Sequence, residues 1–202
     1  MRNRSKLLLA GLCATFLLAA AVSTASANHL SVNEQNHKIV WRALEFNASA
    51  GSNITCELTL EGSFHNRVIA KVAAALIRYI NRASVGTCTS GSLTIHTESL
   101  PWHEQYNSFE GTLPRITSVT IGLVGIRWRL RNSAETCEFG TTQTEPGFGT
   151  IALGAEGEAT SITASGTINL GGNFLCGFAT ATLSGRGTVR TAAGGTIFVR
   201  LI

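Results

Sequence analysis

The stretch Ile54-Thr55-Cys56-Glu57-Leu58-Thr59-Leu60-Glu61 decides the fold class of this chain. Its apolar side chains occupy every second position, and threonines and glutamates occupy the positions between them. Successive side chains of a strand point to opposite faces, so this alternation predicts a half-buried β-strand. With 21 glycines and 3 prolines, the whole chain suits short strands and tight turns better than long helices.

Similar strand patterns recur outward from this stretch. We predict further strands at 39–46, 93–100, 103–112, 116–131, 162–170, 174–183 and 196–202. The long stretch 116–131 changes character near Gly125. Before it the segment is apolar on both faces, and after it Arg127, Arg129 and Arg131 alternate with apolar residues. Strand signals at this spacing predict a mainly β fold, an antiparallel β-sandwich or barrel.

One segment has a different period and predicts a single amphipathic helix. Apolar residues recur every four positions at Phe64, Val68, Val72, Leu76 and Ile80. Basic residues lie off this line at Arg67, Lys71, Arg78 and Arg82. The pattern indicates about four helical turns packed across the sheet with a solvated polar face. The alternative is contact between the basic side and an anionic membrane surface.

Residues 1–27 have the pattern of a secretory signal peptide. Arg2, Arg4 and Lys6 precede a long apolar run, and Ala25-Ser26-Ala27 offers a cleavage site. An uncleaved membrane anchor is the alternative. We therefore expect a secreted or cell-envelope protein in which 28–202 form a single β-rich domain, with 28–52 poorly ordered in part.

The charge of the exported chain excludes a nucleic-acid binder as the first interpretation. The full chain has 16 Lys and Arg against 12 acidic residues, all of them glutamates. Removing the three cations of the signal leaves 13 against 12, a net charge of +1 instead of +4. The absence of aspartate also excludes aspartic-protease dyads and EF-hand loops.

Cleavage of the signal would also remove Cys13 and leave four cysteines, Cys56, Cys88, Cys137 and Cys176. An even number in an exported chain predicts two disulfides. A zinc site is disfavoured because the gaps between successive cysteines are 32, 49 and 39 residues, with no C-x-x-C pair. Of the three pairings we favour Cys56 with Cys88 and Cys137 with Cys176, which keeps each bridge within one half of the chain.

The densest polar and aromatic cluster suggests a binding face. It comprises Trp102, His103, Glu104 and Tyr106, whose rings and carboxylate would suit a glycan or an envelope surface. The alternative is a secreted hydrolase of the glycan type that uses Glu104 or Glu110 with His103. A solvated strand face is the third interpretation of the same residues.

Other catalytic and ligand-binding motifs fail on inspection. His103-Glu104 begins like a zinc-protease helix, but the second histidine is replaced by Asn107. A site built from His65, His96 and His103 would need the fold to assemble it. No G-x-S-x-G elbow and no phosphate-binding glycine loop occurs. We predict no cofactor and no metal.

Three segments carry a resemblance. Small exported proteins of uncharacterised function from soil actinobacteria resemble this chain in Leu60-Glu61-Gly62-Ser63-Phe64-His65, in Ser99-Leu100-Pro101-Trp102-His103 and in Ser108-Phe109-Glu110-Gly111-Thr112-Leu113-Pro114. The resemblance implies a bacterial exported protein and no particular activity, so it transfers no site residue. It also argues against glycosylation at the N-x-S/T patterns of Asn47 and Asn53.

The sequence therefore favours an exported, disulfide-stabilised protein with a structural or binding role at the cell envelope, and the hydrolase is the alternative. The expected partner is a cell-wall or glycan surface. No nucleic-acid partner is expected, and membrane contact is expected only if the signal is retained or the basic helix is exposed.

Overall fold

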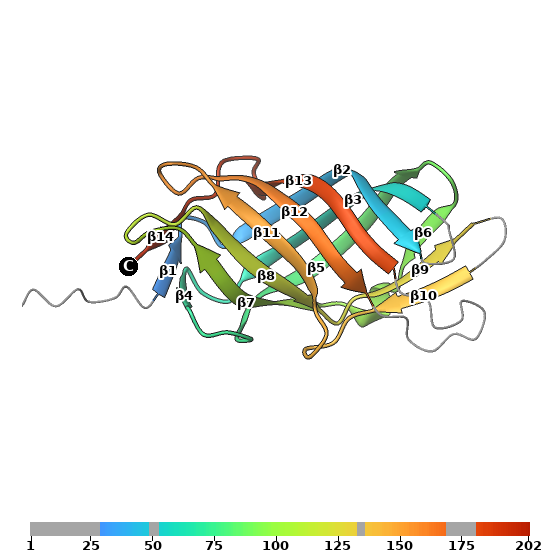
Figure 1. Ribbon diagram of the computed structural model, residues 1–202, viewed down its shortest axis with the longest axis horizontal. Helices are drawn as coiled ribbons and strands as arrows, with labels where there is room; N and C mark the ends of the chain where they lie inside the picture. Colours follow the sequence, from blue (N-terminus) through green and yellow to red (C-terminus); the bar gives the residue numbers. More distant parts are fainter. Residues whose placement is uncertain (1–28, 49–52, 133–135, 169–180) are drawn as a thin grey trace, which may run out of the picture.

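The computed structural model describes residues 29–48, 53–132, 136–168 and 181–202, which are mainly strands (Figure 1). The predicted signal peptide lies outside the described residues. The first part of the chain contains β1 (His29–Val32), β2 (Asn36–Ala48), β3 (Asn53–Phe64), β4 (Val68–Ala70), β5 (Leu76–Cys88), β6 (Ser92–Ile95), the 3-10 turn η1 (Thr97–Ser99) and β7 (Trp102–Glu110). The second part contains β8 (Ser118–Val124), β9 (Arg127–Arg131), β10 (Thr136–Gly140), β11 (Gly147–Leu153), β12 (Ala159–Ile168), β13 (Ala181–Thr191) and β14 (Val199–Leu201).

Eight of these strands close into one antiparallel barrel in the order β11-β12-β13-β2-β3-β5-β7-β8. Each barrel strand pairs with the next barrel strand along the chain, from β2 to β13, and β13 pairs with β2 to close the wall. The prediction of a mainly β, antiparallel fold is confirmed, and of the two architectures left open it is the barrel that forms. Closure leaves the wall without a free edge.

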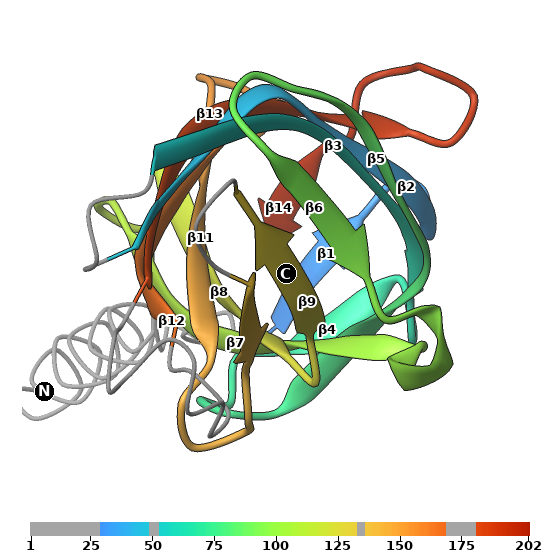
Figure 2. The ribbon, with the colours of Figure 1, turned by 90° about the vertical axis from the view of Figure 1, so that its right-hand side faces the viewer.

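Two small sheets lie at the two ends of the barrel. The end sheet has the order β14-β1-β4, and the cap sheet has the order β10-β9-β6. Figure 2, which looks along the barrel from the cap end, shows β6 and β9 across the opening in front and β14, β1 and β4 behind. In the chain, β6 lies between the barrel strands β5 and β7, and β9 and β10 lie between β8 and β11. The connections between consecutive barrel strands therefore supply the cap sheet.

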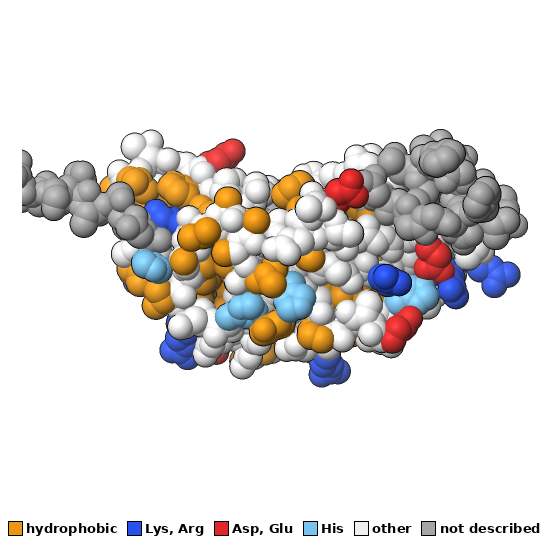
Figure 3. Space-filling model, turned by 90° about the horizontal axis from the view of Figure 1, so that it is seen from below, with side chains coloured by type: hydrophobic (Ala, Val, Ile, Leu, Met, Phe, Trp, Pro, Cys, Tyr) orange, Lys and Arg blue, Asp and Glu red, His pale blue; other side chains and the backbone are white. Residues whose placement is uncertain are grey.

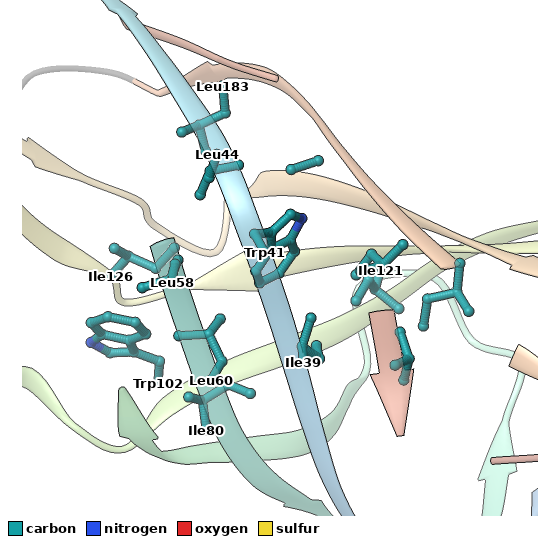
Figure 4. Packing of buried hydrophobic residues seen from close by; sticks show 14 of the residues in the cluster. Ile39, Trp41, Leu44, Leu58, Leu60, Ile80, Trp102, Ile121, Ile126 and Leu183 are labelled. Carbon is teal, nitrogen blue, oxygen red and sulfur yellow. The ribbon is translucent and has the colours of Figure 1, made fainter. Parts of the chain in front are cut away.

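The apolar half of each alternating strand fills the barrel (Figure 4). Burial along β3 alternates over its whole length, as its sequence predicts. Trp41, Leu58 and Leu60 are among the side chains that meet inside, and Trp102 is fully buried. At the cap end Trp128 on β9 packs edge-on against Phe46 at 5.3 Å between ring centroids. The barrel interior is therefore a packed core.

The predicted amphipathic helix over 64–82 is wrong. In the described part of the chain no α-helix occurs, and this segment forms β4, a turn and the first half of β5. Three residues of the expected apolar line, Val68, Val72 and Leu76, are instead 44%, 59% and 39% exposed. The basic residues do not share a face either, because Arg78 is completely buried and the side chain of Arg82 is 82% exposed.

The helix prediction failed because the segment contains two strands, β4 and β5, separated by a turn. Ile69 and Ile77 are buried although they lie off the four-residue line, and of the residues on that line only Phe64 and Ile80, at its two ends, are buried. Between β4 and β5 the chain reverses, with Ala74 in the left-handed conformation at φ 63°. The four-residue spacing of apolar residues thus combined residues of β3, β4, the turn and β5, which do not form one element.

The predicted strand 116–131 is two strands. Gly125, with φ 83°, ends β8, and the chain enters the cap sheet as β9. In β9 burial alternates, with Arg127, Arg129 and Arg131 exposed and Trp128 and Leu130 buried, so the arginines share one face as predicted. Residues 169–180, which include part of the predicted strand 174–183, lie outside the described residues. Strands β1 and β2 occupy most of 28–52.

The predicted bridge between Cys56 and Cys88 is present and joins the directly opposed residues of β3 and β5. It closes a loop with a sequence separation of 32. In the chain-entropy model such a bridge stabilises the fold by about 3–4 kcal/mol. Cys137 is also disulfide-bonded, and its predicted partner Cys176 lies outside the described residues.

Candidate functional site

The predicted binding face on β7 is divided between the two sides of the barrel wall. Trp102, Glu104 and Tyr106 point into the barrel and are 0%, 1% and 4% exposed. His103 lies between them in sequence and points outward, where its ring contacts that of Tyr79 at 4.9 Å. The alternation of a strand explains this division. Ligand binding by these four residues stays a prediction.

The residues of the hydrolase alternative are also separated. Glu104 is paired with the buried Arg78 on the neighbouring strand β5. Glu110 lies at the other end of β7, exposed, where it accepts a hydrogen bond of 3.4 Å from the Ser118 hydroxyl. The structure therefore does not bring Glu104, Glu110 and His103 into one cleft.

The three histidines of the conceivable metal site lie in two places. His65 and His103 both pack against the ring of Tyr79, with ring centroids 4.1 and 4.9 Å from that of the tyrosine. Burial, followed by the charge of His103, lowers the pKa of His65. His96 lies at the cap end. Within the described residues, no group of three or more His, Cys, Asp or Glu side chains could hold a metal ion.

The barrel interior offers little space for a ligand. Its cavity is about 40 Å³, lined mainly by apolar side chains such as Leu44, Leu58 and Ile162, with Glu104 at its edge. A water molecule occupies about 30 Å³ of liquid, so the cavity is of the size of one water. A ligand site has to be sought on the outside of the barrel.

A hollow lies at the cap end, and we call it the cap groove. It has a volume of about 530 Å³, within the range of small-molecule sites. Its lining comes from the segment after β6, from β9 and β10, and from the β10–β11 loop. The lining residues are His96, Glu98, Ile126, Arg127, Glu138, Phe139, Gly140, Thr141, Thr142 and Glu145. Apart from the apolar floor, nearly every lining side chain is polar or charged.

The floor of the cap groove is fixed by a hydrogen-bonded crossing of two loops. The backbone N–H of Ile126 donates to the hydroxyl of Thr141 at 3.2 Å, and the Thr141 N–H donates to the carbonyl of Ile126 at 3.1 Å. Ile126 is 1% exposed and also borders the interior cavity. The floor therefore separates the groove from the barrel core.

One wall of the cap groove is a charged network centred on His96. Its Nδ1 lies 2.7 Å from a carboxylate oxygen of Glu98, and its Nε2 lies 2.8 Å from one of Glu138. The other oxygen of Glu138 accepts a hydrogen bond from Nε of Arg129. The hydrogen bond to Glu98 is the largest cause of the raised pKa of His96. Burial opposes it, and the hydrogen bond to Glu138 adds to it.

The network has a chemical consequence. Both imidazole nitrogens face carboxylates, so the protonated ring can donate to both at once. Neither nitrogen is then free to take a proton from a bound molecule. The arrangement orders the groove wall, which suits recognition better than general-base catalysis.

Sequence reasoning named only part of this site. The sequence places His96 among three histidines of a conceivable metal site and Arg127 among the arginines that alternate with apolar residues after Gly125. Glu138 and Glu145 carried no local signal. The pairing of Glu138 with Arg129 depends on the register of β9 and β10, which places these two residues directly opposite each other. The strand pattern of 127–131 did predict that the three arginines share one face.

Comparison with protein-family models, curated proteins and solved structures found no match to this chain. Nowhere in the described ranges does a helix have the length and apolar character needed to span a membrane. The site therefore has to be interpreted from its own chemistry.

Proposed function

We propose that this protein is an exported glycan-binding protein of the cell envelope, and that the cap groove is its binding site. The observation that carries the proposal is a groove of about 530 Å³ lined by carboxylates, hydroxyls, an arginine and a fixed histidine. Sugars present many hydroxyl groups, which donate to carboxylates and accept from guanidinium groups. The lining supplies both kinds of partner at close range.

Export is part of the proposal and rests on two supports. The disulfide between Cys56 and Cys88 is compatible with an extracellular protein, because such bridges persist in oxidising compartments. The pattern of residues 1–27 is that of a signal peptide. The resemblance to exported proteins of soil actinobacteria points the same way.

A binding role is favoured over hydrolysis by the state of the groove's titratable groups. His96 is engaged at both ring nitrogens, and Glu138 is engaged by both His96 and Arg129. Glu145, on the β10–β11 loop that also lines the groove, is exposed. A glycan would meet an ordered polar wall and a free carboxylate.

The test is titration of the folded protein with a panel of neutral and acidic oligosaccharides by calorimetry. We expect one class to bind and Glu145→Ala to weaken it about tenfold, the effect of one hydrogen bond to a charged group. Glu110→Ala is the matched control, an exposed glutamate at the far end of β7. The proposal fails if no oligosaccharide binds, if the two variants weaken binding equally, or if the bound glycan is cleaved.

A further inference from the structure

On the outward face of the cap sheet, the arginines of β9 are flanked by side chains of β6 and β10, and we call this set of strand residues the grid. On β9, Arg127, Arg129 and Arg131 point away from the barrel, while Trp128 and Leu130 point inward. The register places Thr94 of β6 and Glu138 of β10 on either side of Arg129, and Ser92 beside Arg131. We call these three arginines the arginine row. Figure 3 shows charged side chains gathered at this end of the molecule, on the right.

The charge of this face is concentrated compared with that of the chain. Alternate residues of a strand are about 7 Å apart, so the row sets three like charges at short, regular intervals. Only Glu138 opposes them among the strand residues of the grid, and it pairs with the central Arg129, whose side chain is 46% exposed. Arg127 and Arg131, at the two ends, are exposed. In a nearly neutral exported chain this is a local basic surface.

The arginine row is continuous with the cap groove. Arg127 and Glu138 belong to both, because each lines the groove and lies on the outward face of the cap sheet. A polymer lying along β9 would place its charged groups over the arginines and a neighbouring uncharged unit in the groove. Guanidinium groups suit this role because their planar fork matches phosphate and carboxylate oxygens.

We propose that the ligand of the cap is a linear polyanion of the cell envelope, a polymer that carries phosphate or carboxylate groups along its length, and that Arg127 and Arg131 bind these groups. This inference rests on the proposed function and specifies its ligand class. Polyol-phosphate polymers and polyuronates share the required chemistry. Arg129 is held by Glu138 and positions the centre of the row.

The test measures the affinity of the folded protein for polyglycerol phosphate and for polygalacturonate at several salt concentrations. Neutral dextran and single-stranded DNA are tested alongside. The variant is Arg127→Gln with Arg131→Gln, which spares the pair between Arg129 and Glu138. The matched control is Arg42→Gln with Arg186→Gln, which removes the same charge from exposed positions on β2 and β13. Circular dichroism and thermal unfolding verify that both double variants are folded.

We expect at least one polyanion to bind more tightly than dextran, and the Arg127 and Arg131 variant to lose about tenfold in affinity. The slope of log affinity against log salt concentration should fall by about one for each arginine removed, because fewer counterions are released. Whichever polyanion binds more tightly identifies the source of the anionic groups. The control variant should retain affinity and slope.

Three results would overturn the inference. These are equal losses in the two double variants, no preference for either polyanion over dextran, and tighter binding of single-stranded DNA than of both polyanions. If neutral oligosaccharides bind in the cap groove while the polyanions do not, the inference fails and the proposed function stands. If neither sugars nor polyanions bind, both fail.

Discussion

Arg78 and Glu104 form an ion pair on the inner wall of the barrel, where β5 and β7 place them directly opposite each other. They are 0% and 1% exposed. Burial lowers the pKa of Arg78 to about 9, which still leaves the guanidinium charged at neutral pH. Its planar group also lies over the ring of Phe64 at 5.3 Å. The pair balances two charges that neither residue could hold alone in the core.

The first prediction concerns this pair. Glu104→Gln should lower the free energy of unfolding by about 3–5 kcal/mol, because it leaves a buried guanidinium without a counter-charge. The double variant Arg78→Met with Glu104→Leu should recover most of that loss, since it removes both charges and fills the space with apolar atoms. Urea unfolding followed by tryptophan fluorescence measures both.

Glu110→Gln is the control, because its carboxylate is exposed at the end of β7, and its stability should stay within about 0.5 kcal/mol of the wild type. A Glu104→Gln protein as stable as this control would refute the structural role of the pair. Any loss of function in Glu104→Gln has to be compared with its loss of folding.

The alternation of apolar residues was sufficient to predict the β architecture, the inward side of β3 and the exposed face of β9. It was not sufficient for 64–82, where a turn at Ala74 separates β4 from β5. The strand period could not be recognised because β4 has only three residues and β5 carries few buried residues. A register irregularity between Leu76 and Arg78 further obscured the alternation of β5.

The candidate site was harder to predict than the fold because it depends on contacts between distant segments. His96 and Glu138 are 42 residues apart in sequence and meet only when β6 and β10 flank β9. The inward position of Glu104 was equally hidden, since its partner Arg78 precedes it by 26 residues. The local sequence pattern showed which residue types are present, but which of them become neighbours depends on the strand pairing of the closed barrel and its cap sheet.

The second prediction concerns His37, which is buried inside the barrel beside Phe64, with ring centroids 5.1 Å apart. Burial, followed by the charge of Arg78, lowers the pKa of His37 well below the ordinary 6.5. Below pH 6.5 the unfolded chain therefore binds a proton that the folded chain does not. The free energy of unfolding therefore decreases as the pH is lowered, by about 1.4 kcal/mol at one pH unit below the unfolded pKa of His37.

Urea unfolding of the wild type and of His37→Leu at pH 7.5 and 5.5 tests this. The variant has no imidazole to titrate, so the difference between its two stabilities should be smaller by about 1.4 kcal/mol. An identical difference in both proteins would mean that His37 does not contribute to the pH dependence.

The third prediction concerns His96, whose pKa shift has the opposite sign. Its hydrogen bond to Glu98 is the largest cause of the raised pKa, so Glu98→Gln should return the pKa towards 6.5. The stability that His96 contributes is fully present below 6.5 and is lost as pH rises through its raised folded pKa. NMR titration of the imidazole protons measures the shift directly.

Glu145→Gln is the matched control for this titration. Glu145 also lines the cap groove, on the β10–β11 loop, and the two carboxylates that hold His96 are Glu98 and Glu138. The control should leave the titration curve of His96 in place. Equal displacement of the curve by both variants would assign the shift to the general charge of the groove.

The last prediction concerns the C-terminal strand β14, which pairs with β1 in the end sheet. Deleting residues 198–202 removes Val199, which is 7% exposed, and uncovers Leu30 on β1, which is 2% exposed. It also breaks the 2.7 Å hydrogen bond from the Val199 N–H to the Gly157 carbonyl. Loss of about one buried aliphatic side chain and its strand pairing should cost about 2–4 kcal/mol.

The deletion should also leave β1 as an unpaired edge, which favours association between molecules. Urea unfolding measures the stability, and size-exclusion chromatography at several concentrations measures the association. Arg200→Ala is the control, since it removes an exposed side chain from β14 and keeps the backbone pairing with Ser31. It should change stability by less than about 1 kcal/mol. If the deleted chain were as stable and monomeric as the Arg200→Ala protein, the end sheet would not support the barrel.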